Sequence, residues 1–168
     1  MDKQELIKEI ENVYQYRDEF ANLISKYEKI IILGNGGSNA ISAHIAQDLT
    51  KQLGKKAFTF SDPSRLTCYI NDYGMKYANK QFLKEFADKD TLVILISSSG
   101  NSDNMFYAQF YCIKENIPHI ILTGFNKDNK MRKMAEEELC EPLLNIYVNS
   151  HDYGVVECVH QILLHSII

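Results

Sequence analysis

The chain has 168 residues, of which 45% are apolar and 24% are charged, and its formal net charge is −4. This is the composition of an ordinary globular domain, and it excludes a disordered or low-complexity protein. The negative charge and the lack of a basic stripe along the sequence argue against nucleic acid as a partner.

The sequence carries no sign of a membrane or secretory context. No apolar run approaches the roughly 18 residues of a membrane span, and residues 1–20 are charged throughout, unlike a signal peptide. Cys68, Cys112, Cys140 and Cys158 show no C-x-x-C spacing. We therefore expect a cytoplasmic protein with no membrane partner, whose thiols are reduced and mostly in the core.

Residues 3–27 have apolar positions at helical spacing and predict one amphipathic helix. After it, short apolar runs alternate with helical patterns. The runs predict buried parallel strands at 29–33, 56–60, 91–96, 119–123 and 143–148. Helices are predicted at 38–53, 62–71, 75–87, 103–116 and 154–168, and the acidic stretch 135–141 is predicted to be a solvated face or loop.

Strands that alternate with helices over residues 1–168 predict a single α/β domain, built as a doubly wound, five-stranded parallel sheet. Ligands of such sheets bind beyond the carboxyl ends of the strands. Two loops of unusual composition lie there, GNGGSN (34–39) after the first strand and SSSGNSDN (97–104) after the third. These loops are the first candidates for a binding site.

The serine-rich turn opens a predicted helix. A helix start carries unpaired N–H groups and a partial positive charge, both of which attract phosphate. Ser97, Ser98, Ser99 and Ser102 add hydroxyl donors without bulk, and Gly100 permits a tight bend. The alternative is a helix cap within a polar loop, for which one serine would suffice. Four serines together favour a phosphate site.

The first loop fits a dinucleotide-binding turn only in part. The G-x-G-x-x-G pattern would end here at Asn39 in place of a glycine, and Asp62 after the second strand would be the ribose ligand. Two other interpretations stay open and are about equally favoured. The loop is either a strand-to-helix turn that needs glycine, or a backbone that approaches a small polar ligand.

Two predicted helices carry a further polar set. His44 and Asp48 lie four residues apart on one helix face, and Glu157 and His165 lie eight apart on roughly one side of the last helix. Together these side chains could bind zinc or transfer protons. Separately, each pair is more often structural, and spacing alone does not bring the two helices together.

Five segments resemble the sugar isomerase (SIS) domain family, and within it the phosphoheptose isomerases: GNGGSNAISAHIAQDLT, DPSRLTCYINDYG, ISSSGNSDN, ILTGFNKDN and YGVVECVHQILLH. They occur in the family's order over about residues 30–168. The resemblance implies a flavodoxin-like fold assembled as a homotetramer, with the helix at 1–27 at the oligomer interface. It also implies a reaction, the conversion of D-sedoheptulose 7-phosphate to D-glycero-D-manno-heptose 7-phosphate through an enediol.

The resemblance implies three groups of site residues. The phosphate contacts fall on Ser97, Ser98, Ser99 and Ser102. The sugar contacts fall on Asn35, Gly36, Gly37, Asn71, Asp72 and Glu157. One zinc ion per subunit would be bound by His44, Asp48, Glu157 and His165, of which Asp48 and His165 also carry the acid–base roles.

Two of these positions depart from the family's pattern. Asp48 stands where a glutamate is usual, which shortens its reach by roughly 1.5 Å, and Glu157 replaces a usual glutamine, which adds negative charge beside a metal. An isomerase of another phosphosugar is therefore a second hypothesis. A third is a non-catalytic sugar-phosphate sensor or protein adaptor, which would keep the serine turn without needing the acid–base residues.

Overall fold

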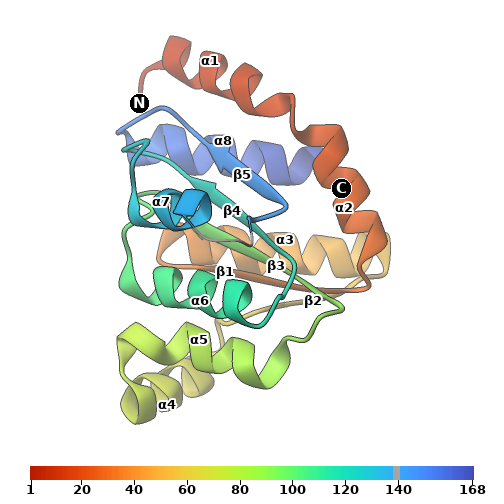
Figure 1. Cartoon of the computed structure of the whole chain (residues 1–168). Helices are drawn as coiled ribbons and strands as arrows, with labels where there is room; N and C mark the ends of the chain where they lie inside the picture. The colour runs from red at the N-terminus through yellow and green to blue at the C-terminus, as the bar shows by residue number, and fades with distance from the viewer. Residues whose placement is uncertain (138–140) are drawn as a thin grey trace.

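The computed structural model describes residues 1–137 and 141–168, which form a parallel five-stranded sheet between two layers of helices (Figure 1). The strands are β1 Lys29–Gly34, β2 Lys56–Thr59, β3 Thr91–Ser97, β4 His119–Thr123 and β5 Leu144–Tyr147. Their order across the sheet is β2-β1-β3-β4-β5. The prediction of a doubly wound, flavodoxin-like sheet is confirmed, and the order reverses between β1 and β3.

The two helical layers cover opposite faces of the sheet. One face is covered by α1 (Lys3–Tyr14), α2 (Arg17–Lys26), α3 (Gly37–Leu53) and α8 (Tyr153–Ser166). The other is covered by α5 (Met75–Phe86), α6 (Asp103–Lys114) and α7 (Lys130–Glu137), with α4 (Pro63–Tyr73) beside α5.

The central strand β3 shows why the apolar runs are continuous. Leu92, Ile94 and Ile96 belong to the core on the side of α3 and α8. Val93 and Leu95 belong to the core on the side of α5 and α6. All five side chains are 0% exposed, because a parallel strand between two helical layers is covered on both faces.

The N-terminal segment differs from the single helix predicted at 3–27. It bends at Gln15 and Tyr16, so that α1 lies along α8 while α2 inserts Phe20 and Ile24 into the core. The helical spacing continues across the bend because both parts face the same core. The apolar stripe is thus covered only in part, because Ile7 and Tyr14 remain 47% and 49% exposed, and a role at an oligomer interface stays a prediction.

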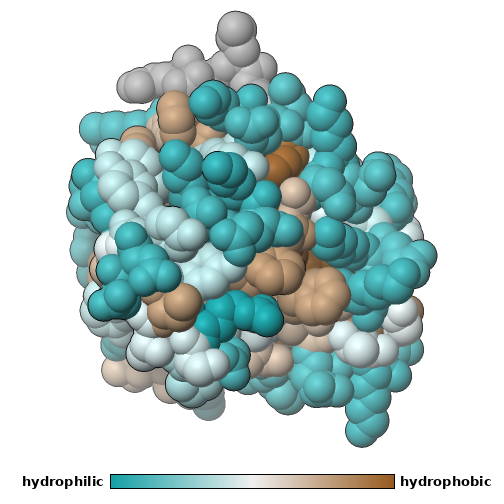
Figure 2. All heavy atoms as spheres, turned by 90° about the horizontal axis from the view of Figure 1, so that it is seen from below, coloured by the Kyte–Doolittle hydropathy of each residue, from teal (hydrophilic) through white to brown (hydrophobic). Residues whose placement is uncertain are grey.

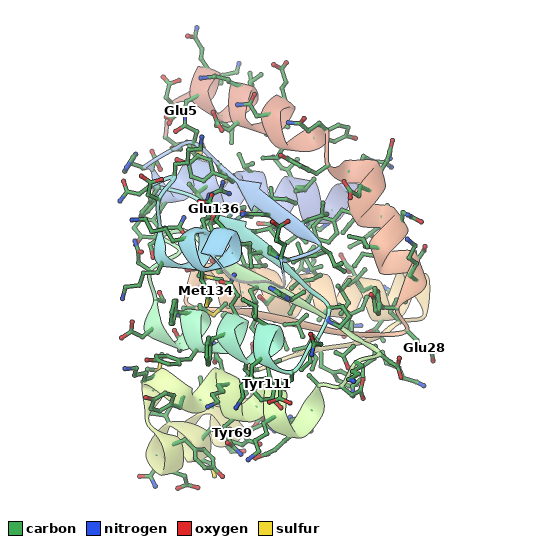
Figure 3. The ribbon with its side chains drawn as sticks, viewed as in Figure 1. Glu5, Glu28, Tyr69, Tyr111, Met134 and Glu136 are labelled. Atoms are coloured by element: carbon green, nitrogen blue, oxygen red, sulfur yellow. The ribbon has the colours of Figure 1, made fainter. Side chains whose placement is uncertain are left out.

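The acidic stretch at 135–141 is helical where it begins, since α7 extends to residue 137. Met131 and Met134 lie on the buried side of this helix and Glu136 on its exposed side (Figure 3). Charged residues separate the few apolar positions of this helix, so the sequence pattern did not indicate a helix here. The rest of the predicted loop includes residues 138–140, which lie outside the described residues.

The pair of helices α4 and α5 is joined through Tyr69, which is labelled in Figure 3. Its hydroxyl donates to the Glu85 carboxylate, and its ring packs against the rings of Phe60 and Phe82. Burial, followed by the hydrogen bond to Glu85, raises the pKa of Tyr69 to about 12. This contact anchors α4, which has no buried residue of its own.

Across the described ranges, no helix combines the length and the apolar character needed to cross a membrane. Cys112 is buried, Cys158 is half-buried and Cys68 is exposed. The expectation of core cysteines is therefore met only by Cys112, and Cys140 lies outside the described residues.

Candidate functional site

A pocket of about 240 Å³ opens at the carboxyl ends of β1 and β3, where the strand order reverses. Both loops singled out by their composition line it. The lining residues are Asn35, Gly36, Gly37, Ser38, Ile96, Ser97, Ser98, Ser99, Ser102, Tyr153 and Glu157. We call it the serine pocket. Its place at the reversal of strand order is where doubly wound sheets bind ligands.

Three helices begin at the serine pocket, α3 at Gly37, α6 at Asp103 and α8 at Tyr153. Each helix start presents N–H groups without intrahelical partners and a partial positive charge. Among the described residues, no lysine or arginine lines the pocket. The Asp152 carboxylate already caps the start of α8, so the starts of α3 and α6 and the hydroxyl groups are what the pocket offers to an anion, and phosphate suits such a site.

The four predicted phosphate-binding serines differ in their hydrogen bonds. The hydroxyl oxygens of Ser97 and Ser99 accept from the N–H groups of Gly100 and Asn101, each at 3.2 Å, and so shape the turn. Ser102 occupies the N-cap position of α6, yet its side chain makes no capping hydrogen bond. The Ser98 hydroxyl is buried without a hydrogen-bond partner. A capping role therefore does not account for Ser98 or Ser102.

Gly100 gives the serine turn its shape. Its φ of +61° lies in the region that favours glycine. A Cβ here would also overlap the side chain of Asn129, which caps α7 by accepting from the Arg132 N–H at 3.1 Å. The serine turn is thus packed directly against the start of α7.

The first loop brings glycine backbone to the other side of the pocket. Gly36 has a φ of +53°, and a Cβ on Gly37 would lie 2.5 Å from a carboxylate oxygen of Glu157. Asn35 and Asn104 exchange two amide hydrogen bonds, at 2.9 and 2.8 Å, which tie the loop to α6. The glycines therefore serve both the turn and a close approach of backbone to a neighbouring group.

The acidic residue of the dinucleotide interpretation has a structural role. Asp62 caps α4, because its carboxylate accepts from the Arg65 N–H and from the Ser64 hydroxyl, both at 2.8 Å. The bond from the Arg65 N–H, then that from Ser64, holds the pKa of Asp62 below its usual range. These contacts explain Asp62 without a ribose.

The structure brings His44 and Asp48 of α3 together with His165 of α8. Asp48 Oδ2 lies 3.4 Å from His44 Nε2 and 3.9 Å from His165 Nδ1. One ligand atom from each residue lies within 4.8 Å of the other two. Two imidazoles and a carboxylate form a donor set that zinc takes in sites with an open fourth position. We call these residues the His–Asp–His cluster.

Glu157, the fourth predicted metal ligand, is not part of this cluster. It lines the serine pocket and also a second hollow of about 280 Å³ between α3 and α8. Gly37 lines both hollows, and His44 lines the second. The two hollows thus share Gly37 and Glu157 in their linings, and the second reaches His44 of the His–Asp–His cluster.

The predicted sugar contacts Asn71 and Asp72 lie near the end of α4 and do not line the serine pocket. Both are exposed, and they bond to each other, with Asn71 Nδ2 donating to Asp72 Oδ1 at 2.9 Å. The Cys68 thiol donates to the other Asp72 oxygen at 3.5 Å. Their contact with a sugar stays a prediction.

Two residues at the pocket were missed from the sequence. Asn104 holds the first loop, as described, and Tyr153 lines the pocket as the first residue of α8. A signal for Tyr153 was present, because Asp152 before it caps α8 by accepting from the N–H groups of Gly154 and Val155. The cap thus indicates from the sequence that a helix begins at Tyr153.

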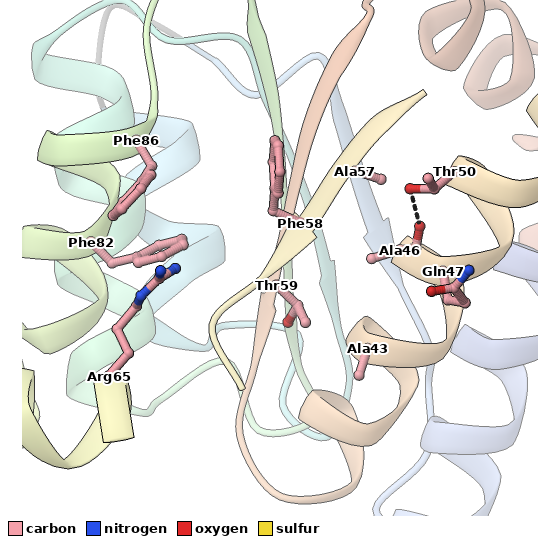
Figure 4. Close-up of a pocket in the computed structure, with 10 residues that line it drawn as sticks. All are labelled: Ala43, Ala46, Gln47, Thr50, Ala57, Phe58, Thr59, Arg65, Phe82 and Phe86. Carbon is pink, nitrogen blue, oxygen red and sulfur yellow. Dashed lines mark hydrogen bonds between the residues drawn. The ribbon is translucent and has the colours of Figure 1, made fainter. Parts of the chain in front are cut away.

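A larger hollow of about 540 Å³ lies between α3, the edge strand β2 and α5 (Figure 4). Phe58, Phe82 and Phe86 give it aromatic walls, and the Arg65 guanidinium lies 5.0 Å from the Phe86 ring centroid. Figure 2 shows apolar side chains gathered over part of the lower face, bordered by polar ones. Arg65 is the one charged residue in the described lining, so this hollow lacks groups for acid–base chemistry.

Comparisons by sequence and by structure both find phosphoheptose isomerases, although no model of a protein family matches the chain. The phosphoheptose isomerase of Fusobacterium nucleatum is 32% identical over 174 residues, which cover 100% of this chain and 84% of that protein. The solved phosphoheptose isomerase of Neisseria gonorrhoeae superposes with a TM-score of 0.84 at 26% identity, over 96% of this chain and 88% of that one. The one from Francisella tularensis gives 0.85 at 21% identity, over 98% and 88%.

Proposed function

The chain belongs to the phosphoheptose isomerase family of SIS-domain proteins, and from this premise we propose that it interconverts D-sedoheptulose 7-phosphate and D-glycero-D-manno-heptose 7-phosphate. One observation carries the proposal. The serine pocket, which suits phosphate, shares Gly37 and Glu157 with a second hollow that reaches His44, one member of a cluster of two histidines and an aspartate. To isomerise an open-chain sugar phosphate, a protein needs an anion site for the phosphate at one end of the sugar and acid–base groups at the carbonyl at the other end.

The separation of the serine pocket and the His–Asp–His cluster along α3 supports a long sugar. Helix α3 leads from Gly37 at the serine pocket to His44 at the cluster. This stretch spans about 10 Å along the helix axis at the usual rise per residue. An extended seven-carbon chain with phosphate at one end covers a comparable length, whereas a three-carbon chain falls short.

The His–Asp–His cluster provides the proton transfers of an aldose–ketose isomerisation. From the ketose, Asp48 takes the proton on C1 while His165 donates a proton to the C2 oxygen, which gives the enediol. Loss of the proton from the C1 hydroxyl and return of a proton to C2 then give the aldose. His44 contacts the same Asp48 oxygen as His165 does, at 3.4 Å, and orients the carboxylate.

We further propose one zinc ion per chain at this cluster. The fit rests on the donor set, because the three ligand atoms lie within 4.8 Å of one another and their types are those of catalytic zinc sites. When bound, zinc would polarise the carbonyl and stabilise negative charge on its oxygen. A carboxylate that ligates a metal is a weaker base, so the two roles of Asp48 compete.

A non-catalytic sugar-phosphate-binding module is the second candidate. It is favoured by the exposure of the cluster, since the side chains of His44 and His165 are 51% and 41% exposed. Sites that transfer protons are usually shielded from water.

The homotetramer expected from the family is also part of the proposal. Light scattering at micromolar protein concentration tests it, and a monomer mass would count against it.

The experiment that tests the proposal is a turnover assay with sugar phosphates of five to seven carbons, with and without zinc. We expect sedoheptulose 7-phosphate to be converted faster than the shorter sugars. Conversion of another sugar alone would change the substrate and keep the reaction class. Binding of sugar phosphates without conversion of any of them would favour the binding module.

A further inference from the structure

The serine pocket has one aromatic wall, Tyr153, and we propose that this ring recognises the carbon chain of the phosphate ester. Tyr153 is the only aromatic residue among the described residues that line the pocket. The polar groups around it can bind phosphate and hydroxyl groups, and the ring adds the one aromatic surface in the described lining on which a carbon chain can pack. The inference rests on the proposed function, because it takes a sugar phosphate as the ligand.

The ring of Tyr153 is supported by Phe125, in the turn after β4. The two ring centroids lie 4.6 Å apart at an interplanar angle of 78°, an edge-to-face contact. Phe125 in turn stacks on the ring of His151, at 5.9 Å and 12°. Tyr153 therefore belongs to a row of three rings beside the serine turn.

Phe125 adopts a backbone conformation that is rare for residues other than glycine, with a φ of +58°. Both of its peptide groups are held in place. Its N–H donates to the Ser150 carbonyl at 2.9 Å, and the Tyr147 hydroxyl donates to its carbonyl at 2.7 Å. A strained backbone conformation of this kind persists only where the surrounding contacts hold it in place, and such conformations cluster at binding sites.

The residue before it, Gly124, fixes where this turn lies. A Cβ on Gly124 would come within 2.8 Å of the Val156 methyl carbons and 3.1 Å of the Ser98 carbonyl oxygen. The turn is therefore packed between the serine loop and α8. The Phe125–Tyr153 pair consequently has a fixed position relative to the serines.

Tyr153 remains 60% exposed, so most of its ring is available to a ligand. The carbon chain of a sugar phosphate has C–H surfaces as well as hydroxyl groups. It can pack on an aromatic face and bond to a phenol hydroxyl, whereas inorganic phosphate has no apolar surface. The ligand class that fits is a phosphate monoester of a polyol chain.

Calorimetric titration with two probes, inorganic phosphate and sedoheptulose 7-phosphate, tests the inference. We expect Tyr153→Ala to weaken binding of the ester roughly three- to tenfold, the scale of one aromatic contact. Its affinity for inorganic phosphate should equal that of the wild type. Tyr153→Phe keeps the ring and should keep most of the affinity for the ester. Phe125→Leu should give a smaller loss, again for the ester alone.

Equal weakening of both probes by Tyr153→Ala would show that the ring only supports the pocket, and unchanged ester affinity would remove the ring from recognition. Either result overturns the inference. The wild type separates this failure from failure of the proposed function. If it binds inorganic phosphate but no sugar phosphate, both fail. If it binds and converts the ester while Tyr153→Ala keeps the wild-type ratio of affinities, only the inference fails.

Discussion

The imidazole rings of His44 and His165 lie edge to face with their centroids 5.0 Å apart, and Asp48 contacts both. The contact joins α3 to α8, and both of these helices begin at the serine pocket. The same two helices therefore position the serine pocket at their starts and the His–Asp–His cluster further along. Under the proposed function, this arrangement sets the distance between the two ends of the sugar.

The first prediction concerns zinc. His44→Gln and His165→Gln should each reduce the zinc content from about one ion per chain to near none, because a three-ligand site that loses one ligand loses most of its affinity. Elemental analysis after dialysis measures this. His151→Gln is the matched control, since His151 is exposed and bonds to Asn126 at 3.1 Å. Zinc retained in either cluster variant would place the metal elsewhere. A wild-type protein without zinc would leave proton transfer as the only proposed role of the cluster.

The second prediction concerns turnover. Asp48→Asn and His165→Gln keep size and hydrogen bonding but lose the titrating group. Loss of general acid–base catalysis costs about 10²–10⁴ in rate, so kcat should fall at least about 100-fold in both. Binding of inorganic phosphate should persist, because neither Asp48 nor His165 lines the serine pocket. Near-normal kcat in one variant would remove that residue from the mechanism.

The third prediction separates phosphate binding from helix capping. Ser98→Ala, Ser99→Ala and Ser102→Ala should each weaken phosphate binding by about 1–2 kcal/mol, the scale of one hydrogen bond to a charged group. The free energy of unfolding should hardly change in Ser98→Ala, because the lost hydroxyl is buried without a partner. Ser25→Ala on α2 is the control for a serine outside the pocket. Lower stability with unchanged phosphate affinity would instead indicate a capping role.

The strands could be predicted because a parallel strand covered on both faces appears as an unbroken apolar run. The range predicted at 119–123 is that of β4, and the other strands differ at their ends by one residue. The bend at Gln15 and Tyr16 could not be predicted, since the spacing of apolar residues continues through it. The helix α7 was missed because Met131 and Met134 are scattered among charged residues.

The two loops of the site could be predicted because serines and glycines crowd at the ends of buried strands. The contact of His165 with Asp48 depends on how α3 packs against α8, and no spacing within one helix encodes that packing. The prediction that these residues share a site therefore came from the resemblance to a family. The positive φ of Phe125 has no signature in the sequence, because such conformations are expected of glycine and asparagine.

The fourth prediction tests the packing of the serine turn. Gly100→Ala should lower the free energy of unfolding by about 2–4 kcal/mol, because it combines a positive φ with overlap against Asn129. Gly54→Ala is the matched control, because Gly54 has a φ of +67° but nothing within 4 Å of the added Cβ. Its cost should be about 1 kcal/mol. Equal losses in urea denaturation would show that Asn129 moves aside freely.

The last prediction concerns acid stability and His160. This residue is 0% exposed, and its Nε2 donates to the Thr123 carbonyl at 3.3 Å. Thr123 is the last residue of β4 and pairs with Ser97 at the end of β3. Burial lowers the pKa of His160 to about 4, and the Thr123 bond offsets this only in part. Burial also lowers the pKa of His119.

Between about pH 6.5 and pH 4 the unfolded chain therefore binds more protons than the folded chain does. The contribution of His160 to the free energy of unfolding is therefore highest above about pH 6.5, falls as the pH drops towards 4, and levels off below that. The part due to His160 is on the order of 3 kcal/mol. His160→Met cannot be protonated, so its stability should fall less over this range, even if it is lower at neutral pH. Urea unfolding across the range measures the slope, with His151→Gln expected to match the wild type. An unchanged slope in His160→Met would assign the acid sensitivity to other groups, His119 first among them.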